Sequence, residues 1–120
     1  MTDPESAGRH AFFADLVAEA PIPDRGILSQ TLSDEGGVRV VVFSFAAGEE
    51  LSEHTAARPA IVHILAGEGE LVADGQAHPA KPGSWLRMAA GTAHAIRART
   101  GMVMALYLLP AGPMSPDDAG

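Results

Sequence analysis

Residues 48–67, GEELSEHTAARPAIVHILAG, and residues 83–98, GSWLRMAAGTAHAIRA, are the two stretches that decide the fold. Each stretch begins at a glycine, continues through a histidine and contains a short run of apolar residues. The two histidines are His54 and His94. Side chains from separate strands of a curled sheet can point into one interior. We therefore expect the two imidazoles to converge inside an all-β shell.

Short β-rich runs follow one another between residues 26 and 110, with turn residues between most of them. This spacing is typical of a sandwich or barrel. Asp74-Gly75 is a strong signal for a two-residue hairpin, whereas the acidic residues Glu49, Glu50 and Glu53 are expected on a loop. The expected strands cover residues 27–32, 38–45, 60–65, 70–73, 76–78, 84–88, 94–97 and 102–109.

The two ends of the chain differ from this central region. Residues 1–25 are expected to form an N-terminal tail and one short amphipathic helix, whose apolar residues recur at helical spacing before Pro21. Residues 111–120, AGPMSPDDAG, have the composition of a disordered tail. The predicted organisation is therefore a single barrel over residues 26–110.

Composition excludes several classes of protein. The 120 residues include no cysteine, which removes disulfides and thiolate metal sites. With 15 acidic and 8 basic residues the net charge is -7 and the basic residues are dispersed, so nucleic acid is not an expected partner. The longest apolar run is far shorter than the roughly 20 residues of a membrane-spanning helix. The start, MTDPES, does not read as a secretion signal. We expect a cytoplasmic protein with no membrane partner.

With these framing residues the chain resembles the cupin superfamily. The first motif of that family is G-x5-H-x-H-x3-E-x6-G, and the second is G-x5-P-x-G-x2-H-x3-N. The resemblance implies a cupin-type double-stranded β-helix, or jelly-roll barrel. Six positions match with the correct internal spacing: Gly48, His54, Gly67, Gly83, Gly91 and His94.

Alanine replaces other residues of the two motifs. Ala56 stands at the second histidine, Ala60 at the glutamate, Ala89 at the proline and Ala98 at the asparagine. Cupins usually bind a metal through three histidines and a glutamate, so the resemblance leaves only His54 and His94 as metal ligands. Two imidazoles without a carboxylate imply one weakly bound divalent transition metal, Fe, Mn, Ni, Cu or Zn, or no cofactor at all. In the second case the rings hydrogen-bond to each other, to water or to the backbone.

The other histidines are weaker candidates. Residues 60, 62 and 64 share one face of a strand, so His63 should point to the opposite, outer face. A bulge could turn it inward as a third ligand, although that strand has no internal glycine. His10 and His78 are expected on the surface.

Small apolar residues are predicted to line the barrel near the two histidines. Such a lining favours a small, largely apolar organic ligand, and the alternative is a compact barrel filled by its own side chains. The predicted lining is Ala56, Ala60, Val62, Met88 and Ala98.

The function favoured by these observations is a stand-alone cupin barrel that binds such a ligand, with or without a metal held by two histidines. Two enzymatic alternatives stay open. One is a metal-dependent oxidoreductase or dioxygenase, and the other is a metal-free isomerase or lyase with a histidine as acid or base; no catalytic residue is assigned. Strands such as VVVFSF and VMALYLL are apolar on both faces, which predicts a second cover, either another sheet or another subunit. We therefore expect a β-sandwich that also forms a homodimer; the alternative is a monomer in which these strands are simply central.

Overall fold

The structure is a computed structural model that describes residues 9–111. Within these residues the chain forms one 3-10 turn, η1 (Val17–Glu19), and nine strands. The strands are β1 (Ile27–Glu35), β2 (Val38–Phe45), β3 (Glu50–His54), β4 (Ala60–Ala66), β5 (Gly69–Ala73), β6 (Gln76–Ala80), β7 (Trp85–Met88), β8 (His94–Ala98) and β9 (Met102–Leu108).

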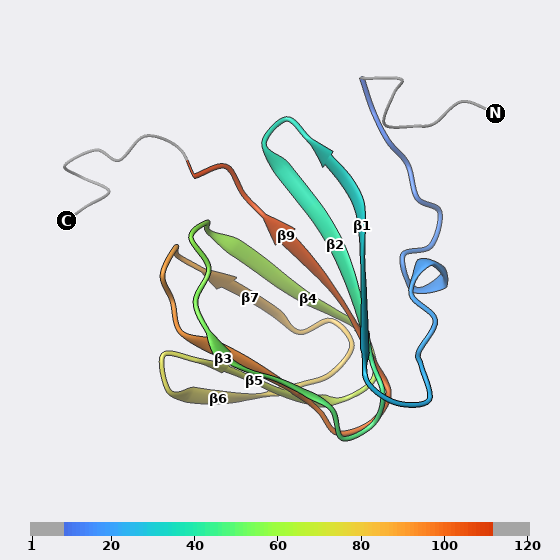
Figure 1. Cartoon of the computed structure of the whole chain (residues 1–120), viewed down its shortest axis with the longest axis vertical. Coiled ribbons are helices and arrows are strands. Elements are labelled where there is room, and N and C mark those ends of the chain that lie inside the picture. Colours follow the sequence, from blue (N-terminus) through green and yellow to red (C-terminus); the bar gives the residue numbers. More distant parts are fainter. Residues whose placement is uncertain (1–8, 112–120) are drawn as a thin grey trace.

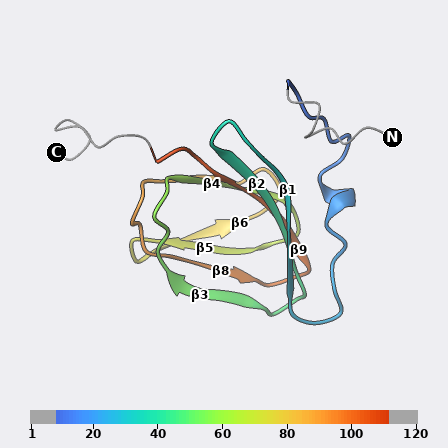
Figure 2. The same ribbon diagram turned by 45° about the horizontal axis from the view of Figure 1, so that its top comes forward.

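Two antiparallel sheets form the two layers of the barrel (Figures 1 and 2). The five-stranded sheet has the order β1-β2-β9-β4-β7, and the four-stranded sheet has the order β3-β8-β5-β6. Strand pairs are nested, because β2 pairs with β9, β3 with β8, β4 with β7 and β5 with β6. This nesting is the jelly-roll topology that the sequence predicted, and the all-β fold class is confirmed.

Local chemistry explains where the strands turn. Asp74 and Gly75 have φ values of 51° and 77°, so the short turn between β5 and β6 uses the left-handed conformation that aspartate-glycine pairs favour. All eight expected strands form, with ends shifted by at most three residues. The strand that the pattern missed is β3, whose sequence ELSEH has no apolar alternation beyond Leu51.

The predicted N-terminal helix is wrong. Only Val17–Glu19 forms a 3-10 turn, which begins where Asp15 Oδ1 accepts the backbone N–H of Val17 at 3.0 Å. Phe13 and Leu16 of this segment pack on the barrel without a regular helix, whereas Phe12 and Val17 are exposed. Residues 1–8 and 112–120, which include most of the predicted C-terminal tail, lie outside the described residues. Between residues 9 and 111 no helix is long and apolar enough to cross a membrane.

The main core lies between the two sheets. Inward-facing residues of both sheets are almost completely buried there, as the strand periodicity requires. The buried members are Phe45, Ala60, Val62, Ile64, Leu71, Ala80, Met88, Ile96, Ala98, Met102 and Met104.

A second, smaller cluster lies on the outer face of the five-stranded sheet. Here Val42 and Val103 are buried against the N-terminal segment, which contributes Phe13 and Leu16. The hydroxyl of Ser44 donates to the carbonyl of Pro21 at 2.9 Å and ties the segment to β2. Strands β2 and β9 are therefore apolar on both faces because one face meets the other sheet and the other meets the chain's own N-terminal segment.

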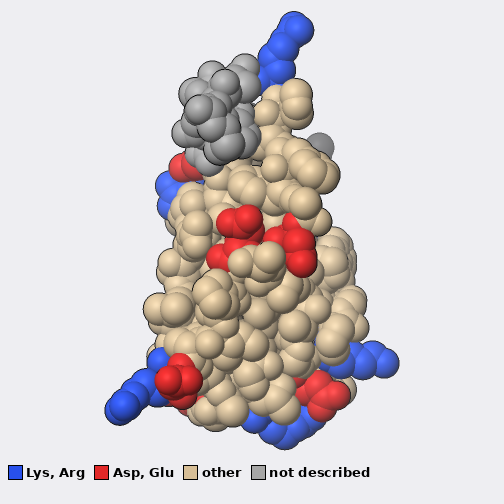
Figure 3. All heavy atoms as spheres, turned by 90° about the vertical axis from the view of Figure 1, so that its right-hand side faces the viewer, with Lys and Arg blue, Asp and Glu red and all other residues tan. Residues whose placement is uncertain are grey.

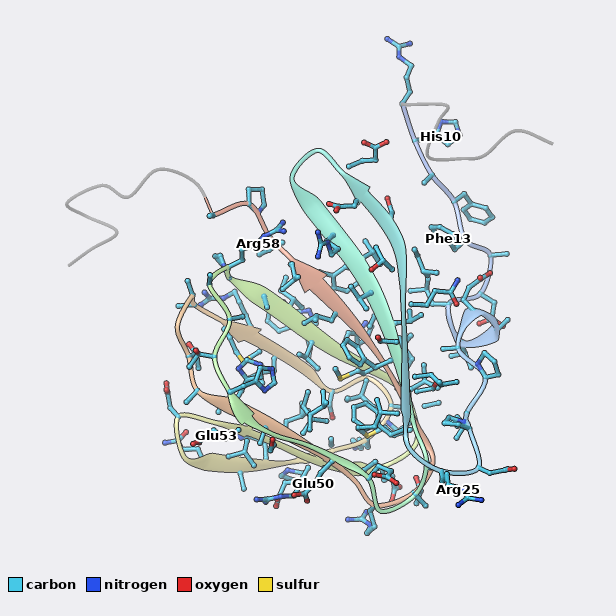
Figure 4. All side chains as sticks on the ribbon, viewed as in Figure 1. His10, Phe13, Arg25, Glu50, Glu53 and Arg58 are labelled. Atoms are coloured by element: carbon cyan, nitrogen blue, oxygen red, sulfur yellow. The ribbon has the colours of Figure 1, made fainter. Side chains whose placement is uncertain are left out.

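The face that carries the N-terminal segment has no basic strip. Figure 3 shows that most of this surface belongs to uncharged residues, with acidic side chains near its middle and basic ones at its margins. Phe13 lies on the segment beside β1, whereas His10 lies farther along it, away from the barrel (Figure 4).

Candidate functional site

His54 and His94 meet at one end of the four-stranded sheet. His54 is the last residue of β3 and His94 is the first residue of β8, and the two are opposite partners in the β3–β8 ladder. Their ring centroids are 4.2 Å apart, with an angle of 57° between the ring planes. Strand pairing therefore brings these two imidazoles into contact although they are distant in sequence.

Backbone carbonyls hold both rings in the same way. Nδ1 of His54 lies 2.9 Å from the carbonyl oxygen of Ser52, and Nδ1 of His94 lies 2.8 Å from that of Thr92. A carbonyl oxygen only accepts hydrogen bonds, so each Nδ1 carries a proton and donates it. Each neutral ring consequently keeps an unprotonated Nε2, whose lone pair can accept a hydrogen bond or coordinate a metal.

The two histidines differ in their exposure. His94 is buried, with 7% of its surface exposed, and shares its strand face with Ile96 and Ala98, which belong to the main core. His54 is exposed because β3 is the edge strand of its sheet. The pair therefore extends from the barrel interior to solvent, so a molecule can reach it from outside.

Backbone hydrogen bonds hold together the loops around this end of the barrel. The N–H of Gly91 donates to the carbonyl of Ala56 at 2.8 Å, which joins the loop after β3 to the loop after β7. The N–H of Asp74 donates to the carbonyl of Ala93 at 2.9 Å and joins the β5–β6 hairpin to the same loop. These bonds fix the backbone on both sides of His94.

Arg58 is a positioning residue that sequence reasoning missed. Its Nε donates to the carbonyl of Leu109 at 2.9 Å, and its Nη2 donates to the carbonyls of Gly37 and Leu108. It is a residue of the β3–β4 loop and lies near the end of β9 (Figure 4). The guanidinium thus links three chain segments, and an arginine in a loop carries no sequence signal for such a role.

The predicted lining residues divide into two groups. Ala60, Val62, Met88 and Ala98 are between 1% and 4% exposed and pack inside the main core. Ala56 is half-buried in the loop that follows β3, because β3 ends at His54 and does not continue to residue 56. Ala56, which was predicted to line the barrel, therefore lies on its rim.

The remaining histidines do not join the pair. His63 is half-buried on the outer face of the five-stranded sheet, opposite Trp85 and Ala105, while its neighbours Val62 and Ile64 point into the core. His10 and His78 are exposed. His78 nevertheless faces the same side of its sheet as Leu71, its partner in the β5–β6 ladder.

The donor set does not fit the metal site expected of a complete cupin motif. Among residues 9–111 no three His, Asp or Glu side chains come together in a way that could hold a metal ion. Glu50 and Glu70 of the four-stranded sheet instead pair with Arg97, at 3.6 Å and 2.6 Å. The site offers two imidazoles without a carboxylate, so a divalent ion would receive most of its ligands from water.

Comparison with known proteins agrees with this fold. Residues 41–109 match the Cupin domain family. A conserved protein of unknown function from Streptococcus pyogenes is 31% identical with a TM-score of 0.75, over 89% of this chain and 92% of that one. An RmlC-like cupin from Desulfovibrio desulfuricans is 29% identical with a TM-score of 0.75, over 84% and 98%.

A cupin superfamily protein from Desulfitobacterium hafniense is 28% identical with a TM-score of 0.74, over 79% of this chain and 87% of that one. No curated protein matches the chain. The matched segment covers more than half of the chain and contains both glycine-framed stretches, with the histidine pair at the end of the barrel. The chain belongs to the cupin superfamily.

Proposed function

We propose that this protein is a cupin barrel that binds a small, largely apolar organic molecule, whose polar end is held by His54 and His94. The observation that supports the proposal is that the two rings make the same hydrogen bond to the backbone. Both Nδ1 atoms donate to backbone carbonyls, so both Nε2 lone pairs remain for a ligand. The ring centroids are 4.2 Å apart, close enough for one ligand group to contact both rings.

The chemistry of the pair specifies the polar end of the ligand. Two hydrogen-bond acceptors attract a donor such as a hydroxyl or an amine, and they disfavour a carboxylate, which only accepts. The nearby side chains of Ala56, on the loop after β3, and Ile96, two residues along the strand from His94, are apolar and suit a hydrocarbon body. We therefore assign a ligand with a hydrogen-bond donor at one end and an apolar remainder.

A matched pair of probes tests this assignment. Hexan-1-ol is expected to shift the ring NMR signals of His54 and His94 saturably at neutral pH, whereas hexanoate is not. A hydroxyl donates a single hydrogen, to one Nε2 or the other. Changing both histidines to alanine should therefore weaken hexan-1-ol binding about two- to tenfold, as the loss of one hydrogen bond of about 0.5–1.5 kcal/mol implies. The control is His63→Ala on the outer face, which should bind normally. Equal binding by the double variant and the native chain would overturn the proposal.

Weak metal binding is a second candidate, favoured by the same two Nε2 atoms. Nickel or zinc should bind with low affinity, and binding should weaken on acidification because a protonated imidazole has no lone pair for the metal. Isothermal titration at several pH values measures this, with His94→Ala and His63→Ala as test and control. Stoichiometric metal in the His54→Ala/His94→Ala double variant would place the metal elsewhere.

The two enzymatic alternatives would use the same pair of histidines. A metal-free isomerase or lyase would use an imidazole of the pair to move a proton, whereas an oxidoreductase or dioxygenase would need an added metal. Turnover that survives a chelator but is lost in His94→Ala supports the first reading. Turnover that requires added metal supports the second.

We further propose a homodimer through the part of the five-stranded sheet that the N-terminal segment leaves uncovered. Ile61, His63 and Tyr107 are half-buried on this outer face. The outer face of the other sheet, by contrast, carries the exposed ion pairs of Arg97. A partner subunit would therefore bury the apolar face.

A further inference from the structure

A cavity of about 270 Å³ opens on the flank of the barrel, between β6 and β7. These strands are the edges of the two sheets on that side, so neither has a further strand beyond it. The walls of the cavity come from both strands and from β5, and its lining residues are Leu71, His78, Pro79, Ser84, Trp85 and Leu86.

The floor of this flank cavity is apolar. Leu71 is only 3% exposed and belongs to the main core, and Leu86 packs against the same core. His78 is opposite Leu71 in the β5–β6 ladder and therefore faces the same side, although it is exposed at the sheet edge. The cavity thus reaches from solvent to the hydrocarbon of the barrel.

The rim of the flank cavity offers flat surfaces and polar groups together. Trp85 is 58% exposed. As the ladder partner of His63 it belongs to the outer face of the five-stranded sheet, and it lines the cavity from that side because β7 is the edge strand. His78 and Pro79 add a second flat ring and a rigid apolar ring. Ser84 Oγ accepts the backbone N–H of Lys81 at 3.0 Å, so its own hydroxyl hydrogen is left to donate to a ligand.

We propose that the flank cavity is a second ligand site, which takes a single flat aromatic ring bearing a hydrogen-bonding substituent. Indole and imidazole faces contact aromatic rings favourably, and the Ser84 hydroxyl and His78 ring nitrogens can reach the substituent. The volume is below the roughly 300–1,000 Å³ typical of sites for drug-sized molecules, which limits the ligand to about one ring.

This site is separate from the histidine pair. His78 lies on β6 and His94 on β8, with β5 between them. In the ladder His94 is opposite Ala73, which is opposite Gln76, so His78 is also two residues further along. Two strand spacings of about 4.8 Å and about 7 Å along the strand place the two histidines about 12 Å apart. The inference therefore does not depend on the function proposed for His54 and His94.

The chain reports on this site directly, because Trp85 is its only tryptophan. Benzamide is a flat probe, and cyclohexanecarboxamide is a puckered ring with the same amide. Trp85 fluorescence, excited at the red edge of indole absorption, is titrated with each probe. Benzamide should produce a saturable change, and cyclohexanecarboxamide should bind about tenfold more weakly because it lacks an aromatic face.

Variants separate this site from the rest of the molecule. His78→Ala should weaken benzamide binding several-fold, whereas His10→Ala, the same change on the N-terminal segment, should not. The His54→Ala/His94→Ala double variant should bind benzamide normally even if the function proposed for that pair fails. The inference is overturned if no saturable change occurs, or if His78→Ala binds as the native chain does. It is also overturned if the fluorescence change follows subunit association and disappears in a monomeric variant.

Discussion

Replacing Gly67 by alanine is expected to destabilise the barrel far more than replacing Gly48, although both are motif glycines with left-handed φ values of 82° and 85°. A left-handed conformation costs an alanine about 1–2 kcal/mol. Around Gly48 an added Cβ meets nothing within 4 Å, so this backbone cost is the whole penalty. Restriction of the unfolded chain offsets part of it, which leaves about 1 kcal/mol.

At Gly67 the added Cβ would also meet the backbone. It would lie 2.0 Å from the carbonyl oxygen of Gly101 and 2.7 Å from Cα of Met102, where β9 begins. Neither atom is the end of a flexible side chain, so the ends of β4 and β9 must separate. Overpacking adds about 1–3 kcal/mol, which brings the total for Gly67→Ala to about 3 kcal/mol. That is a large share of the 5–15 kcal/mol typical of a folded domain.

Urea unfolding followed by far-UV circular dichroism measures both free energies. The slope with denaturant should stay constant, because the change acts on the native state, while the midpoint falls about three times as far for Gly67→Ala as for Gly48→Ala. If the two variants lost equal free energy of unfolding, the left-handed conformation of Gly67, and not the close approach of Gly101, would be the reason that this position requires glycine.

Three further perturbations follow from burial and contacts. Ile64→Ala should lower the free energy of unfolding by about 2–5 kcal/mol because Ile64 is fully buried, whereas Leu28→Ala, at a half-exposed position, should change it by less than about 0.5 kcal/mol; similar losses would contradict the assigned core. Ser44→Ala removes the hydrogen bond to Pro21 and should speed amide exchange in the N-terminal segment, and unchanged exchange there would show that the bond does not hold the segment. Tyr107→Asp should convert the proposed homodimer to monomers in sedimentation velocity without unfolding the barrel; a native chain that is monomeric at every concentration would refute the dimer.

Local chemistry accounts for most of the architecture. Apolar runs such as Val38–Phe45 and the Asp74-Gly75 turn behave as their residues predict, because strand periodicity and left-handed turns depend on near neighbours. The jelly roll was predicted from the resemblance of the framing residues, from Gly48 to His54 and from Gly91 to His94, to the two cupin motifs. By contrast, β3 was missed because its sequence ELSEH is mostly polar and shows no strand pattern. Hydrogen bonding to β8 in the folded sheet makes this segment a strand.

The N-terminal segment and the site depended on contacts that no local pattern contains. Phe12, Phe13 and Leu16 recur at helical spacing, yet only the short turn after Asp15 forms, and Phe13 and Leu16 pack on the sheet instead. Ala56 lies in a loop because β3 ends at His54. The flank cavity is lined by residues of β6 and β7, which belong to different sheets. These strands become neighbours only when the two sheets pack together.

Residue types and turn chemistry were thus sufficient for the all-β class and for most strands, because strand periodicity and glycine turns depend on near neighbours, whereas the choice of His54 and His94 came from the resemblance to the cupin motifs. Ring-to-ring contact, the carbonyl partners of Nδ1 and the link made by Arg58 came only from the folded chain. The ring-to-ring contact and the Arg58 link join segments that only sheet closure brings together. The Nδ1 bonds are local, each reaching a carbonyl two residues earlier, but they depend on the backbone conformation of the folded chain, because the position of a carbonyl in space is not encoded in the identity of the residue that bears it.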